Sequence, residues 1–374
     1  MKQILLLAAV LLVGCTSGYR SYKKGDYVKA TFDAVERLRN APTNDKAAFV
    51  LSKTYPLAVE SLQRELVRAK ASTSPTNYEL VVQHYETLNT LANEIFHSPA
   101  AIKIIPKPLE FIAEAAQAKE KAAYQCYELG LKLLNNTTVH DARLAYVLFK
   151  RANSYVYDFR DVQKLIDEAR FQGTLRVFFE KPVTSNRFQY SADFFSSNLL
   201  AELNRSLEKH LIAFYSAELN ETNSNLRPHQ YLVLNFEDFS IGNVFDTQRV
   251  MDVKRDSVLV GTATVNGQKV NVYNTVTAKL STFRREIKSG GVLSVKIFND
   301  KNQLIDQQNF SGEYVWYSSW STFNGDERAL SAEQKRQCEL RPQLPPPHQN
   351  LFVEFTKPIY SQTLNYLRNY YKKR

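Results

Sequence analysis

Apolar residues recur at helical spacing through the first half of the chain. Between residues 19 and 170 they return every three to four positions, which places them along one side of an α-helix. Two stripes, at 78–95 and 111–134, are wide and are typical of helices covered on more than one side. Three prolines between these stripes prevent a single continuous helix: Pro99, Pro106 and Pro108. We therefore predict an all-helical first half.

The period changes near Gly173. Segments 175–179, 211–219 and 231–237 are apolar and of strand length, and a helical stripe at 194–207 lies between the first two. A strand, a helix and a second strand in this order allow the two strands to lie parallel. The second half therefore begins as a mixture of strands and helix.

Long alternation of apolar and polar residues follows, which is typical of strands with one covered face. The apolar face of the first alternating segment gathers Val270, Val272, Val276, Ala278 and Leu280. Asn266-Gly267 precedes this segment and predicts a two-residue hairpin turn after a strand at 261–265. A second alternating segment, 293–297, ends in a turn at 299–302, and 304–317 returns from that turn. These segments predict an antiparallel meander with one solvated face.

The chain closes with a helical stripe at 351–371, and we expect the helix to break or kink at Pro358. The predicted fold class is therefore α+β. Residues 1–14 form a leader and residues 15–172 form the helical domain. Residues 173–374 form a mixed, largely antiparallel β-sheet domain with flanking helices.

The first fifteen residues have the pattern of an export signal. Lys2 is followed by an apolar run that is too short to span a bilayer, and Gly14 precedes Cys15. The sequence Leu12-Val13-Gly14-Cys15 resembles the lipobox of bacterial lipoproteins. That resemblance implies that the leader is removed and that the sulfur of Cys15 carries a diacylglycerol. The alternative is an ordinary signal peptide with an incidental cysteine.

The same resemblance implies a location. A lipoprotein is anchored in the bacterial cell envelope, so membrane lipid becomes a partner through Cys15. Thr16 and Ser17 follow the cysteine, with no aspartate at the next position. In enteric bacteria this arrangement favours the outer membrane.

A helix pair at the start of the helical half resembles a tetratricopeptide repeat. The residues at that family's spacing are Gly25, Tyr27, Ala30, Leu38 and Pro42. In the family, a Gly-Asp-Tyr turn joins two antiparallel helices, a small residue lets them approach, and proline begins the next unit. A second candidate unit covers residues 139–170. The resemblance implies a groove that docks proteins, while an irregular helical bundle without a binding role is the alternative.

The formal charge of +10 comes from basic residues that are scattered along the chain. Their densest groups are at 20–24, beside the expected lipid, and at 372–374. A basic segment beside a lipid favours an anionic membrane surface, and ordinary solvated charge is the alternative. Nucleic acid is a poor fit for an exported lipoprotein, so we expect no such partner. Cys126 and Cys338 do not make a disulfide framework, although an exported compartment would permit a bridge between them.

The sequence contains no strong catalytic or metal-binding signature. Its six histidines have no partner at metal-ligand spacing. Phosphate loops, nucleophile elbows and paired Cys-x-x-Cys motifs are absent from it. We therefore expect no catalytic residues, no metal and no cofactor.

Two weaker candidates remain. Trp316, Trp320 and Asp326 could bind a glycan, because aromatic rings beside a carboxylate suit a sugar. The alternative is a loop in which Asp326 caps the next turn and Arg328 forms a salt bridge. Ser257, within Asp-Ser-Val, resembles the acceptor of a three-residue O-glycosylation motif found on exported proteins of Bacteroidota.

These patterns predict a non-enzymatic, membrane-anchored envelope lipoprotein. We expect its helical domain to dock other envelope proteins and its sheet domain to be a second interaction module. Two alternatives stay open. One is a glycan-binding surface lipoprotein, and the other is a hydrolase whose site the sequence does not reveal.

Overall fold

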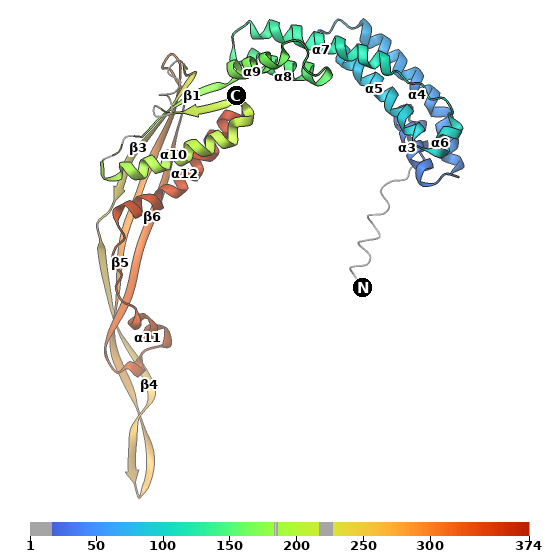
Figure 1. Ribbon diagram of the computed structural model, residues 1–374. Coiled ribbons are helices and arrows are strands. Elements are labelled where there is room, and N and C mark those ends of the chain that lie inside the picture. The colour runs from blue at the N-terminus through green and yellow to red at the C-terminus, as the bar shows by residue number, and fades with distance from the viewer. Residues whose placement is uncertain (1–16, 183, 185, 217–226, 374) are drawn as a thin grey trace. The chain divides into compact units, whose positions relative to one another are not determined.

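The computed structural model describes residues 17–182, 184, 186–216 and 227–373. The chain forms two compact units: one ends at Thr174 and the other begins at Leu175. Helices make up the first unit, and a mixed, largely antiparallel sheet with flanking helices makes up the second (Figure 1). The predicted α+β class is therefore confirmed. The expected leader and Cys15 lie outside the described residues.

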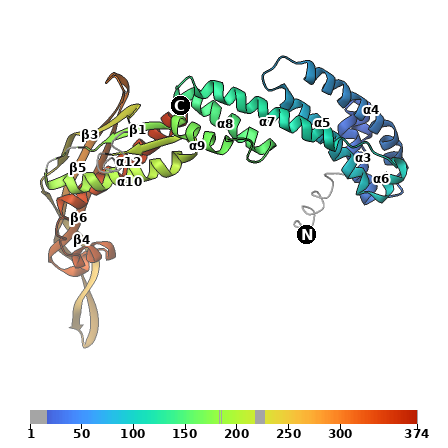
Figure 2. The same cartoon turned by 45° about the horizontal axis from the view of Figure 1, so that its top comes forward.

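The helical unit is a series of helices in which each long helix contacts the next. In chain order the helices are α2 (Tyr19–Lys23), α3 (Tyr27–Asn40), α4 (Asp45–Ala71), α5 (Asn77–Phe96), α6 (Pro99–Ile104), α7 (Ile112–Leu134), α8 (Val139–Tyr155) and α9 (Val162–Gly173). Contacts join α3 to α4, α4 to α5, α5 to α7, α7 to α8 and α8 to α9, with the short α6 beside α3, α4 and α5 (Figure 2). Serial packing of this kind buries one side of each helix and leaves another side exposed to solvent.

Local chemistry explains where these helices begin. The Asp26 carboxylate accepts from the N–H of Lys29 at the start of α3, and the Asn44 side chain accepts from the N–H of Ala47 at the start of α4. Gly25, in the predicted turn between α2 and α3, has a φ of 80°. Glycine adopts this left-handed conformation without strain, so Gly25 allows the tight turn that leads into α3.

The second unit is built on strands β1 (Leu175–Glu180), β2 (Ile212–Tyr215), β3 (Gln230–Ile241), β4 (Phe245–Val265), β5 (Gln268–Asn299) and β6 (Leu304–Gly325). β1 pairs in parallel with β2 and with β3, whereas β5 pairs antiparallel with β3, β4 and β6. The parallel pairing of the first two strands follows from the predicted order of strand, helix and strand. The predicted strand at 211–219 corresponds to the shorter β2, and its last residues lie outside the described residues.

Two helices cover one face of this sheet. α10 (Asn186–Leu207) packs on β2, and α12 (His348–Lys372) packs on β3, β5, β6 and α10 (Figure 1). They bury an apolar core together with Val177, Phe179, Leu232, Leu293, Val295 and Ile297 of the sheet. Shorter helical segments are η2 (Glu208–His210), η4 (Glu327–Ala329) and α11 (Ala332–Glu339).

Helix α12 continues through Pro358, so of the break or kink expected at this proline, the break does not occur. Phe355 and Ile359, on either side of the proline, are completely buried in the core. Pro358 lacks the N–H that would bond to the carbonyl of Glu354, but burial of its neighbours stabilises the helix across this gap.

Strand β5 is continuous and contains both alternating segments predicted from the sequence. It pairs with β4 across the predicted Asn266-Gly267 turn, where the two φ angles are 52° and 78°. β6 accompanies β5 only as far as Ala278, which lies opposite Gly325. Beyond that point β4 and β5 continue as a two-stranded segment, residues 254–277, which we call the ribbon.

The face of β5 that was expected to be half-buried is covered at one end only. Val276, Ala278 and Leu280 are buried as predicted, and Ala329 of η4 packs on the first two. Val270 and Val272, however, are 48% and 40% exposed. Every residue from 259 to 275 is exposed, so the alternation in the outer part of the ribbon has no layer of described residues to cover it.

Candidate protein-binding grooves

A polar groove runs along the exposed side of α5. Gln83, Glu86, Thr90 and Asn93 lie along it at spacings of three and four residues, which places them on one side of the helix. Flanking residues come from α7 and α8: Ile112, Ala115, Ala116, Lys119, Arg151 and Tyr155. Two hollows of about 550 and 640 Å³ share Glu86 and together make up the groove.

Asn89, at the edge of this groove, holds a segment of backbone. Its Nδ2 donates to the carbonyl of Phe111 at 3.2 Å, and its Oδ1 accepts from the N–H of the same residue at 2.6 Å. One side-chain amide therefore satisfies both polar groups of one backbone residue. Asn93, one turn further along α5, is exposed, and its amide has no hydrogen-bond partner among the described residues.

A carboxylate at the other end of the groove is already occupied. Glu79 accepts from the hydroxyl of Tyr155 at 3.2 Å, from Arg151 at 3.3 Å and from the thiol of Cys126 at 3.6 Å. Burial, reinforced by the negative charge of Glu79, raises the pKa of Cys126 to about 12. The thiol therefore stays protonated at neutral pH, and thiolate chemistry is not available there.

A second groove, of about 610 Å³, lies between α10 and α12. Its lining residues are Ser191, Phe194, Phe195, Asn198, Ala201, Glu202, Arg205, Val353, Thr356, Lys357, Tyr360 and Ser361. Phe194 is 63% exposed and Val353 is 38% exposed. Because its walls are the outer stripes of two helices, this groove suits an elongated apolar ligand such as another helix.

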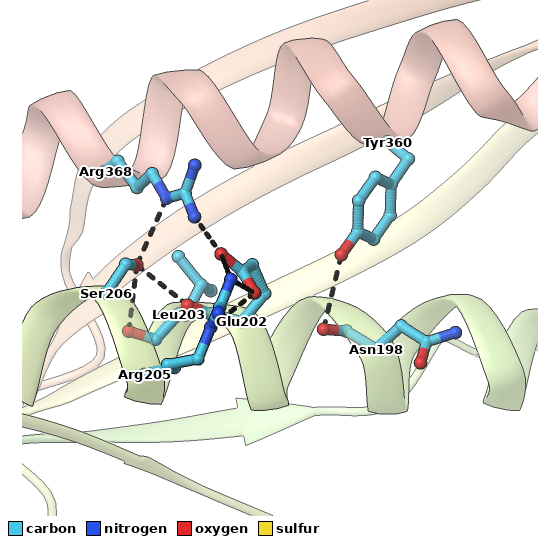
Figure 3. Close-up of polar contacts among 7 residues, drawn as sticks. All are labelled: Asn198, Glu202, Leu203, Arg205, Ser206, Tyr360 and Arg368. Atoms are coloured by element: carbon cyan, nitrogen blue, oxygen red, sulfur yellow. Dashed lines mark hydrogen bonds and ion pairs between the residues drawn. The ribbon is translucent and has the colours of Figure 1, made fainter.

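Polar contacts at one end of this groove fasten the two helices together (Figure 3). Glu202 of α10 pairs with Arg368 of α12 and with Arg205, and Arg368 also donates to the hydroxyl of Ser206 at 3.1 Å. The hydrogen bond from Arg205 and the nearby Arg368 keep the pKa of Glu202 below its ordinary value. Tyr360 donates to the carbonyl of Asn198 at 3.3 Å. These contacts position α12 and do not present a reactive group.

The predicted ligand residues lie on or next to β6. Trp316 and Trp320 are four residues apart on the strand, so they share one face of the sheet. Trp320 stacks on Phe283 of β5, with ring centroids 5.3 Å apart and an interplanar angle of 9°. The Asp326 carboxylate caps η4 by accepting from the N–H of Arg328, and it forms an ion pair with that side chain at 2.6 Å. Asp326 thus makes the contacts predicted for a self-anchored loop.

The remaining sequence candidates are distributed over the sheet unit. Ser257 is exposed within a bulge of β4 and has a φ of 57°. Its neighbour Asp256 accepts from the hydroxyl of Thr275 at 2.7 Å. Cys338 is half-buried on α11, and both it and Cys126 are free thiols, so the bridge that the compartment would permit is not formed.

The described residues contain neither a cluster of metal ligands nor a membrane-spanning helix. Across 17–182, 184, 186–216 and 227–373, no three His, Cys, Asp or Glu side chains gather as metal ligands. No helix within that part of the chain is both long and apolar enough to cross a membrane.

Neither groove was predicted from the sequence. The first could have been, because amides and hydroxyls recur at helical spacing along α5 and mark a polar side of that helix. The second groove joins residues of α10 and α12 that are at least 148 positions apart, Arg205 and Val353 being the nearest in sequence, and it has no local sequence signature.

Comparisons with known proteins gave no match, so the function has to be inferred from the fold and the grooves. No protein-family model matches the chain. No curated protein shows significant sequence similarity to it.

Proposed function

We propose that the chain is a non-enzymatic lipoprotein of the bacterial cell envelope, anchored through Cys15, whose helical unit docks extended segments of other envelope proteins. The sheet unit supplies a second interaction surface, in the groove between α10 and α12. The leader and the lipobox-like sequence support the location, and the serial packing of helices supports the scaffold role.

The two hydrogen bonds between the side chain of Asn89 and the backbone of Phe111 are the main support for the docking proposal. An extended peptide has unsatisfied N–H and C=O groups, and an amide that bonds both groups holds it regardless of its side chains. Asn93 and Gln83 repeat this chemistry on the exposed side of the same helix. The groove along α5 therefore fits the backbone of an extended segment.

Site-specific photo-crosslinking tests this docking in cells. A photoreactive residue in place of Leu80, which lines the groove, should form an adduct with a defined envelope protein. The double variant Gln83→Ala, Asn93→Ala should lose that adduct. Gln63→Ala removes an exposed amide from α4, outside the groove, and should leave the adduct unchanged. An adduct that persists in the double variant would contradict docking at this groove.

Lipid anchoring has its own test. Replacing Cys15 removes the sulfur that would carry the diacylglycerol, so Cys15→Ala should retain the leader and lose label from an alkyne-tagged fatty acid. Globomycin, which inhibits removal of lipoprotein leaders, should cause the unsubstituted chain to retain its leader too. Unchanged gel mobility and unchanged membrane partition after both treatments would refute the anchor.

A further inference from the structure

In the part of the chain that the structure describes, one edge of β5 has no strand beside it in the ribbon. From Gln268 to Thr277, β5 pairs with β4 on one side, and β6 has already left the other side at Gly325. Among the described residues, no other strand continues along this edge. A two-stranded ribbon is only marginally stable in water, and an unpaired edge is a template for another strand.

The two edges of the ribbon differ in regularity. On β4, register shifts between Arg255 and Val258 and between Leu259 and Gly261 each insert an extra residue. Bulges of this kind disrupt pairing along the strand that carries them. The opposing stretch of β5 has no extra residue, so β5 offers the regular edge.

Alternation identifies the backbone groups on that edge. The carbonyl of Thr277 accepts from the N–H of Asp326, on the side that β6 occupies further along β5. Successive residues of a strand direct their backbone groups to opposite sides. Asn271, Tyr273 and Thr275 therefore point their N–H and C=O groups towards the free edge.

The charge pattern of the ribbon restricts what can cover this edge. Lys269 is the only charged residue between Asp256 and Lys279. Apart from Lys269, the exposed side chains between these two residues are neutral, and the large apolar ones among them are Leu259, Val260, Val265, Val270, Val272 and Tyr273. A strand bearing several charges would find no opposite charges along this edge to pair with. A neutral strand rich in β-branched residues fits, and the segment 270–277 of this chain is itself such a strand.

We propose that a second copy of this chain covers the edge, with the two β5 segments paired antiparallel about a two-fold axis at Tyr273. Val270 of one copy then faces Val276 of the other and Asn271 faces Thr275, so no charges oppose each other. The second strand runs in the direction of β6 and continues its line. The paired stretch is limited to residues 270–276, because the carbonyl of Thr277 already accepts from Asp326 and Ala278 already pairs with β6. This dimer is independent of the lipid anchor and of the groove along α5.

One contact has to be exchanged when the copies pair. The N–H of Thr275 donates to Oδ1 of Asn274 at 2.8 Å, so this side chain occupies a donor that the second strand needs. Asn274→Val removes the competing acceptor and adds an apolar contact opposite Val272. This variant should therefore dimerise more strongly than the unsubstituted chain.

Cysteine crosslinking at the proposed axis tests the pairing and its register. Directly opposed residues have Cα atoms about 5.5 Å apart, which a disulfide can bridge. With Cys338 replaced by serine in the full chain, Tyr273→Cys should give a covalent dimer under mild oxidation of intact cells. Val260→Cys, at a similarly exposed position on the bulged β4, is the matched control and should remain monomeric.

A second variant separates edge pairing from misfolding. Asn271→Pro removes an outward-pointing N–H without removing a bond to β4, so the ribbon is retained and the second strand is blocked. Added to Tyr273→Cys, it should abolish the covalent dimer with an unchanged circular dichroism spectrum. Sedimentation of the full chain in detergent should give a dimer that Asn271→Pro converts to a monomer. Equal crosslinking at residues 260 and 273, a monomer at all concentrations, or an adduct with a different protein would each overturn the proposal.

Discussion

Asp326 and Arg328 form a close pair at the end of β6. The carboxylate accepts from both the guanidinium and the N–H of Arg328, and these hydrogen bonds lower the pKa of Asp326 to about 2. Arg328 also donates to the carbonyl of Leu259 at 2.7 Å. The pair therefore connects the loop after β6 to the ribbon.

Removing the Arg328 guanidinium should raise the pKa of Asp326. In Arg328→Ala the pKa of Asp326 should rise towards its ordinary value of 3.8, as followed by NMR titration of the carboxyl carbon. Because the folded pKa is the lower one, the pair stabilises the fold above about pH 4, and this contribution is lost as the pH falls towards 2. A pKa that stays near 2 in the variant would show that the backbone N–H alone depresses it.

Distance along the chain decided which residue contacts could be anticipated. Asp326 and Arg328 are two positions apart, and their pairing was predicted as the alternative to a glycan site. Asn89 and Phe111 are separated by 22 positions, and Glu202 and Arg368 by 166. Composition and spacing carry no information on contacts of that range, which only packing creates.

At the scale of elements, α12 lies against β6 with almost no space between the two backbones. A Cβ on Gly312 would be 2.3 Å from the carbonyl oxygen of Phe355 and 2.9 Å from the side chain of Ile359. The first neighbour is backbone and cannot move aside alone. Gly312 therefore determines how closely the helix approaches the sheet.

Gly312→Ala should destabilise the sheet unit by about 1–3 kcal/mol, the usual cost of overpacking a well-packed site. Thermal denaturation should show a lower transition temperature. Gly261→Ala is the control, because its added Cβ would have no neighbour within 4 Å. That control should change stability by no more than about 0.5 kcal/mol. Equal effects at the two positions would refute the close approach.

The strands show what periodicity can and cannot predict. The alternation at 293–297 and the Asn266-Gly267 turn gave the correct strand and hairpin, because both depend on local geometry. Val270 and Val272 have the same alternation, yet nothing described packs on them. Periodicity indicates that one face of a strand is apolar. It does not indicate whether another element covers that face, because the covering element lies elsewhere in the chain.

The whole molecule consists of two units with separate cores. Among the described residues, two buried apolar clusters are formed within the helical unit and two within the sheet unit. Each unit therefore has the apolar burial that independent folding requires.

Fragments divided at Thr174 test this independence. Residues 17–174 should give a mainly helical circular dichroism spectrum with cooperative melting. Residues 175–374 should give a strong strand signal with a helical contribution from α10 and α12. A mostly helical second fragment, or the absence of a cooperative transition in either fragment, would contradict the division.

The position of α12 after all the other described elements of the sheet unit determines when that unit can fold. Phe352, Phe355, Ile359, Leu364, Leu367 and Tyr371 are all buried in its core, and they are synthesised after every strand of the sheet. Before these residues are synthesised, the apolar side of α10 and one face of the sheet lack the side chains of α12 that bury them. Nascent chains shorter than about 352 residues should therefore remain sensitive to proteases, whereas the helical unit can already be complete. The sheet unit is thus the later of the two to fold, and a truncation before α12 removes part of the core of the whole unit as well as one helix.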